Sequence, residues 1–95
     1  MSRREQLDAS LAALRSEYRA ALPARLERID SLLAAGRLKE LERELHTLAG
    51  SAGTFGLAAV ATAASAAQEL LAESPSDREE LERLLRVLRH EACVG

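Results

Sequence analysis

Residues 37–56 read RLKELERELHTLAGSAGTFG, with apolar side chains spaced as in an amphipathic helix. The steps are of three and four residues, at Leu38, Leu41, Leu45, Leu48 and Ala52. Residues spaced in this way share one face of an α-helix, so the stretch predicts a helix with one buried seam. At ~100° per residue, His46 points about 130° away from the centre of that seam. We therefore expect His46 to face solvent.

Glycines and cations share the side of this helix on which His46 lies. Gly50 follows one turn later and Gly53 lies close beside it, whereas Lys39 and Arg43 come in the preceding turns. A glycine in a helix interior costs about 0.5–1 kcal/mol relative to alanine. Two such losses beside a histidine indicate that something must approach the ring closely. The alternative is a solvated histidine near a fraying helix end.

The motif His-x-Leu-x-Gly, followed by Ser-Ala-Gly-Thr-Phe-Gly, resembles the signature of histidine-containing phosphotransfer (HPt) domains. The resemblance extends over residues 18–88, although only the central segment is specific. It implies that His46 accepts a phosphoryl group and that Gln68, on the next helix, meets the histidine. Many members carry a lysine three residues after the histidine, where this chain has Ala49. From the residues alone, Gln68 is equally well an ordinary glutamine at the edge of a helix seam.

The resemblance also implies a partner. The receiver domain of a response regulator, or a hybrid sensor kinase, would exchange a phosphoryl group with His46, and the receiver's aspartate and Mg²⁺ would supply the chemistry. The chain itself has no glycine-rich P-loop with its lysine and no acidic cluster that would plainly hold Mg²⁺. We therefore expect a phosphocarrier of a two-component phosphorelay rather than a self-sufficient enzyme, with no metal or cofactor of its own.

The residues around the histidine suit this chemistry. A neutral imidazole is a nucleophile at pH 7. Phosphoryl transfer needs positioning and charge neutralisation more than covalent chemistry from the protein. Arg43 and Lys39 are expected to offset part of the phosphate charge, although surface cations contribute modestly. Open surface for access and partner docking is expected at Ala49, Gly50 and Gly53.

Length and composition bound the fold class. The 95 residues suffice for one domain, spanning residues 1–95. They are 47% hydrophobic and 29% charged, with no tryptophan, one tyrosine and one phenylalanine. Leucine and alanine dominate, which favours helix over strand. We therefore predict an all-α fold.

Charge and cysteine content narrow the partners and the compartment. The formal net charge is −2, and no basic tract with interleaved aromatic residues is present, which argues against nucleic-acid binding. No stretch approaches the ~20 apolar residues of a membrane span, and no signal peptide is visible. The single Cys93 fits a reducing compartment. We expect a monomeric cytoplasmic domain, standing alone or cut from a longer chain.

The first third of the chain predicts two helices. Ser2 and Glu5 form a capping box that opens a short leading helix. Ser16, as an N-cap, or Pro23, as a helix breaker, then separates it from a long helix that ends at Gly36. The leading helix is expected to cover one end of the bundle.

The remaining patterns predict three more helices. The helix with His46 covers residues 37–53, and an alanine-rich helix covers residues 57–73. Ser76 and Glu79 form a capping box for the last helix. Because the connections are short, the prediction is an antiparallel up-down-up-down four-helix bundle with a short leading N-terminal helix.

Other roles remain open at this point. The main alternative is a non-catalytic helical adaptor or oligomerisation bundle whose leucine seams bind another helix. It explains the seams equally well but leaves the arrangement of His46 and its glycines without a reason. A thiol or metal site that joins His46 to Cys93 has no supporting spacing. His90, near the C-terminal end of the last helix, is expected to be structural or neutral.

Overall fold

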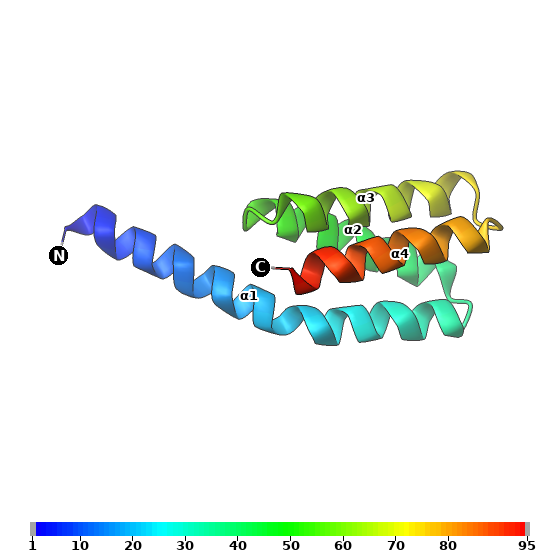
Figure 1. The fold of residues 1–95 in the computed structure, drawn as a ribbon, viewed down its shortest axis with the longest axis horizontal. Coiled ribbons are helices and arrows are strands. Elements are labelled where there is room, and N and C mark those ends of the chain that lie inside the picture. Colours follow the sequence, from blue (N-terminus) through cyan, green and yellow to red (C-terminus); the bar gives the residue numbers. More distant parts are fainter. Residues whose placement is uncertain (1, 95) are drawn as a thin grey trace.

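The computed structural model describes residues 2–94, which form four helices and no strand. The helices are α1 (Arg3–Ala34), α2 (Leu38–Thr54), α3 (Ala58–Glu73) and α4 (Arg78–Cys93). The chain reverses after each of the first three helices, so that α2, α3, α4 and the second half of α1 lie side by side (Figure 1). The all-α prediction is confirmed. No helix within residues 2–94 has both the length and the apolar character that crossing a membrane requires.

The core contains only apolar side chains among the described residues. The predicted seam of α2 is confirmed, because Leu41, Leu45, Leu48 and Ala52 are completely buried. The other helices contribute Leu22, Leu26, Ile29, Leu32 and Leu33 from α1, Val60, Ala63, Ala64, Ala67 and Leu71 from α3, and Leu81, Leu85 and Leu88 from α4. Full burial of a leucine is worth roughly 1.5–3 kcal/mol. This burial fixes the rotation of α2 and so decides which of its side chains face outward.

The expected division of the first helix is wrong. One continuous helix runs from Arg3 to Ala34 with Pro23 inside it, and Ser16 caps nothing. A proline removes one backbone hydrogen bond and crowds the preceding turn, but Leu22 and Leu26 on either side of Pro23 are both buried in the core. Their burial holds the two segments in one helix.

The consequence is an arm that projects from the bundle. At 1.5 Å per residue, α1 is about 48 Å long, roughly twice the length of each other helix. Its first half extends past the bundle, and the helix changes direction where it reaches the bundle, as a proline inside a helix causes (Figure 1). The arm therefore does not cover the end of the bundle, and Leu7, Leu11 and Leu14 remain exposed on it.

The turns after α1 and α2 have the same construction. Gly36 and Gly56 have φ values of 70° and 77°. Each is followed by a residue whose N–H reaches back across the turn: Arg37 N donates to Leu32 O and Leu57 N to Ala52 O, at 2.9 and 2.8 Å. This is the Schellman arrangement, which needs a left-handed residue after the helix. The prediction that Gly36 ends the first long helix is confirmed.

The N-cap predicted for α1 is confirmed, whereas the one predicted for α4 is wrong by one residue. The Glu5 N–H donates to Ser2 Oγ at 3.2 Å, as predicted for α1. In α4, however, the cap is Asp77 rather than Ser76, and its Oδ1 accepts from the Glu80 N–H at 3.2 Å. A carboxylate caps as well as a hydroxyl does and also interacts favourably with the positive end of the helix dipole.

The two residues with phenyl rings, Tyr18 and Phe55, join the middle of α1 to the C-terminal end of α2. The rings of Tyr18 and Phe55 stack with centroids 4.8 Å apart. The Tyr18 hydroxyl is also 2.7 Å from Ser51 Oγ, and Arg25 hydrogen-bonds to both hydroxyls. These contacts hold the inner side of α2 against α1, opposite the side that carries the histidine.

Candidate functional site

The imidazole of His46 stands on the outer face of α2. Its neighbours Leu45 and Leu48 point into the core and are completely buried, whereas His46 is exposed. The predicted exposure of His46 is therefore confirmed. The cause is the rotation of α2, since residues one and two positions apart on a helix point in different directions.

One side chain from another helix contacts the ring. Gln68, on α3, places its Nε2 3.2 Å from His46 Nδ1. Ala64, Ala67 and Leu71 of α3 are buried, which leaves Gln68 at the edge of the seam and partly exposed. Of the two readings of Gln68 that the sequence left open, the structure places this residue in contact with the histidine. Nε2 of the ring has no protein partner among residues 2–94.

A shallow hollow of about 600 Å³ surrounds the ring between α2 and α3. It is lined by Lys39, Glu42, Arg43, His46, Thr47 and Gln68. Lys39 and Arg43 are thus brought together with the histidine, as the sequence suggested. Glu42 and Thr47 were not predicted. Glu42 had a signal in the sequence, because it precedes His46 by four residues and so lies on the same face.

The backbone beyond the histidine is open. A Cβ atom added to Gly50 would meet nothing within 4 Å, and one added to Gly53 would meet only the Cβ of Ala61 at 4.0 Å. Neither glycine has a positive φ, so neither turn of α2 requires glycine for its backbone conformation. Ala49 differs from both, because its side chain is partly buried and packs against the core.

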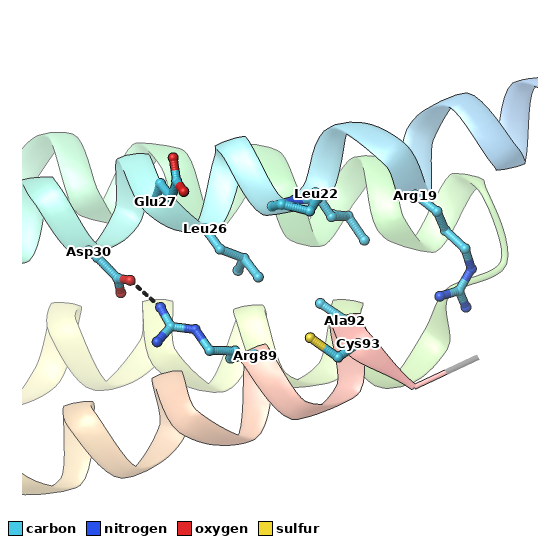
Figure 2. A pocket seen from close by; sticks show the side chains of 9 residues that line it. Arg19, Leu22, Leu26, Glu27, Asp30, Arg89, Ala92 and Cys93 are labelled. Atoms are coloured by element: carbon cyan, nitrogen blue, oxygen red, sulfur yellow. Dashed lines mark hydrogen bonds and ion pairs between the residues drawn. The ribbon is translucent and has the colours of Figure 1, made fainter.

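A second hollow lies elsewhere, between α1 and α4. Leu22 and Leu26 line it together with Cys93, and an ion pair between Asp30 and Arg89 crosses it (Figure 2). His46 does not line it, so the structure does not bring His46 and Cys93 to one site. Residues 2–94 contain no group of three or more histidine, cysteine or acidic side chains placed to hold a metal ion.

Comparison with known protein families gives a match that includes His46, Gly50, Gly53 and Gln68. The Hpt domain family matches residues 5–92, almost the whole chain. The chain belongs to the Hpt domain family. Hpt domains carry phosphoryl groups in two-component phosphorelays and work with response-regulator receiver domains, as phosphocarriers rather than catalysts. No curated protein and no solved structure matched this Hpt domain in the corresponding comparisons.

Proposed function

We propose that this Hpt domain accepts a phosphoryl group on Nε2 of His46 and exchanges it with the aspartate of a receiver domain. The observation that carries the proposal is the exposure of the imidazole together with its contact to Gln68. The ring is exposed, it is held through Nδ1 by Gln68 at 3.2 Å, and it stands beside the bare backbone of Gly50. A ring held through one nitrogen presents the other to an incoming group.

The transfer step balances without a base on this chain. The lone pair of Nε2 attacks the phosphorus of the receiver's aspartyl phosphate, an N–P bond forms, and the P–O bond to the aspartate breaks. The aspartate leaves as a carboxylate. The ring keeps its proton on Nδ1 and becomes positively charged, while the transferred phosphoryl group carries its negative charge to the histidine. What the step needs is in-line approach and neutralisation of charge on the phosphoryl oxygens.

The side-chain amide of Gln68 can either donate a hydrogen bond to the imidazole or accept one from it. With Nε2 of Gln68 toward the ring, the amide donates to an unprotonated Nδ1. A half-turn of the amide brings its oxygen to the same place, where it accepts a hydrogen bond from a protonated Nδ1. The second arrangement leaves the ring Nε2 without a proton and stabilises the charge that the ring gains. We assign Gln68 this positioning role.

The partner completes the site. Lys39 and Arg43 line the hollow and offset part of the phosphoryl charge. The receiver supplies the aspartate and the Mg²⁺ that binds the phosphoryl oxygens, and the Hpt domain needs no cofactor of its own. The receiver docks over Gly50 and Gly53, with the exposed part of Ala49 at the margin.

The single Cys93 supports an assignment to the cytoplasm, where thiols stay reduced.

A second function, binding of another helix, has one observation in its favour. Leu7, Leu11 and Leu14 form an exposed apolar stripe on the projecting arm of α1. An amphipathic helix with such a stripe is typical of adaptor and oligomerisation domains. The stripe lies outside the His46 hollow, however, and gives no reason for its composition.

The test is labelling by a phosphorylated receiver domain. Wild-type protein is expected to take up an acid-labile, alkali-stable phosphoryl group, and ³¹P–¹⁵N correlation NMR should place it on Nε2. His46→Gln should fold normally, by circular dichroism, and take no label. His90→Gln is the matched control, because it removes the other histidine and should label like wild type. Gln68→Leu should slow transfer by up to about a hundredfold, because a ring that loses its positioning contact no longer holds the reacting nitrogen in place.

The outcomes separate the two functions. If His46→Gln labels like wild type, the proposal is wrong at its named residue. If no variant and no wild-type sample is labelled by any of a panel of receiver domains, the carrier function fails and the adaptor function gains. Labelling on Nδ1 would contradict the role given to Gln68 while leaving His46 as the acceptor.

A further inference from the structure

Helix α2 carries three glutamates near the histidine, and one of them, Glu42, differs from the other two in having no ion-pair partner among residues 2–94. Glu40 pairs with Arg37 at 2.7 Å, and Glu44 pairs with Arg28 at 3.0 Å. Glu42 forms no ion pair within 4.0 Å among residues 2–94, although Lys39 and Arg43 are close to it in sequence. It is also the only glutamate among the residues that line the His46 hollow.

The position of Glu42 places its charge near the reacting nitrogen. It precedes His46 by four residues, and side chains at that spacing on a helix start about 5–6 Å apart. Its side chain is partly buried at the wall of the hollow rather than free in bulk solvent. Partial burial reduces the screening of a charge by water, so its effect on a neighbouring phosphoryl group is larger than that of a fully exposed residue.

We infer that Glu42 weakens the hold of His46 on its phosphoryl group and so drives the group toward the receiver. The inference rests on the proposed function. The carboxylate has no cationic partner within 4.0 Å among residues 2–94, so its negative charge is not offset by an ion pair. It repels the phosphoryl oxygens, and this repulsion raises the free energy of the phosphorylated state more than that of the unphosphorylated state.

In this role Glu42 acts on the equilibrium of phosphoryl exchange and does not itself react. Glu42 neither donates nor accepts the phosphoryl group, and its removal should leave the acceptor chemistry in place. The quantity that it sets is the equilibrium constant between phosphorylated His46 and phosphorylated receiver. That constant depends on the free energies of the separate proteins, so a change in the affinity of docking alone does not alter it.

The experiment mixes the Hpt domain with a phosphorylated receiver domain and Mg²⁺ and measures this constant once the exchange has reached equilibrium. The protein concentrations are kept well below those at which the complex accumulates. For Glu42→Gln, the ratio of phosphorylated to free His46 should rise about two- to fourfold at low ionic strength, and the difference should shrink as salt is added. Glu42→Asp keeps the charge and should stay near the wild-type value. Lys39→Gln and Arg43→Gln should lower the ratio.

Glu44→Gln is the matched control. It makes the same change in net charge on the same helix, only two residues from His46, but on the side that faces α1 through Arg28. It should change the ratio by less than about 1.5-fold, because its charge already has a partner and lies on another face. An equal rise for Glu44→Gln would mean that net charge alone, and not the place of Glu42, sets the equilibrium, and the inference would be overturned.

Failure of this inference is distinguishable from failure of the carrier function. If wild type is phosphorylated on His46 and Glu42→Gln leaves the ratio unchanged or lowers it, the role of Glu42 is wrong and the carrier function stands. If wild type takes no phosphoryl group from any receiver, both fail together.

Discussion

The turns that follow α1 and α2 differ from the outer face of α2 in why they contain glycine. Gly36 and Gly56 have positive φ values, and the two Schellman turns cannot form well without them. Gly50 and Gly53 lie within α2, have no positive φ, and leave room for a larger side chain. The fold therefore explains the glycines of the turns and does not explain those beside His46. Where the fold gives no reason for a costly residue, function is the better place to look for one.

The largest effect that this comparison predicts is on transfer at Gly50. Gly50→Leu should keep the helix, because its Cβ meets nothing within 4 Å and leucine is a strong helix former. It should slow phosphoryl transfer from a receiver tenfold or more, because the longer side chain covers the backbone beside the ring. Stopped-flow or quench measurement of the first-order transfer rate checks this, with circular dichroism as the control for folding. A wild-type rate would show that the open backbone has no part in docking.

The next effect is on stability at Gly56. Gly56→Ala should destabilise the fold by about 1–2 kcal/mol, since an L-residue in the left-handed region is strained by that amount. A Cβ there meets no atom within 4 Å, so the backbone alone is the cause. Urea denaturation measures the change, which corresponds to roughly 4–16 °C in Tm for a domain of this size. Below the unfolding transition, the transfer rate should stay at the wild-type value.

An effect of Gly56→Ala on transfer without an effect on stability would weaken the contrast between the turn glycines and those beside His46. If Gly56→Ala leaves stability unchanged but slows transfer, then Gly56 belongs with the site rather than with the turn. The matching substitution at Gly36, in the other turn of the same construction, provides the reference for a purely structural loss.

The parts of this structure that sequence predicts well are those fixed by local rules. The three- and four-residue spacing of Leu41, Leu45 and Leu48 fixes the rotation of α2, and that rotation alone exposes His46. The glycine after α1 fixes where that helix ends. Both follow from the geometry of one helix and need no knowledge of its neighbours.

The parts that sequence misses depend on contacts between helices or on close competition. Pro23 does not break α1, because the burial of Leu22 and Leu26 outweighs the loss of one hydrogen bond. Asp77 and Ser76 are both good caps, and sequence cannot rank two adjacent candidates. The spacing of Glu42 places it on the face of His46, but in the sequence it looks like one more charge on a solvated helix. The hollow that α3 completes shows that the two side chains line the same wall.

The smallest effect is on stability at Gly50, and it separates the two kinds of glycine most directly. Gly50→Ala should stabilise the protein by about 0.5–1 kcal/mol, because alanine is the better helix former and its methyl group meets no neighbour within 4 Å. A single methyl group leaves most of the backbone open, so transfer should stay within about twofold of wild type. Urea denaturation and the transfer rate, measured on one preparation, check both. A loss of stability would mean that the fold does require glycine at this position, and the contrast between the turns and the His46 face would disappear.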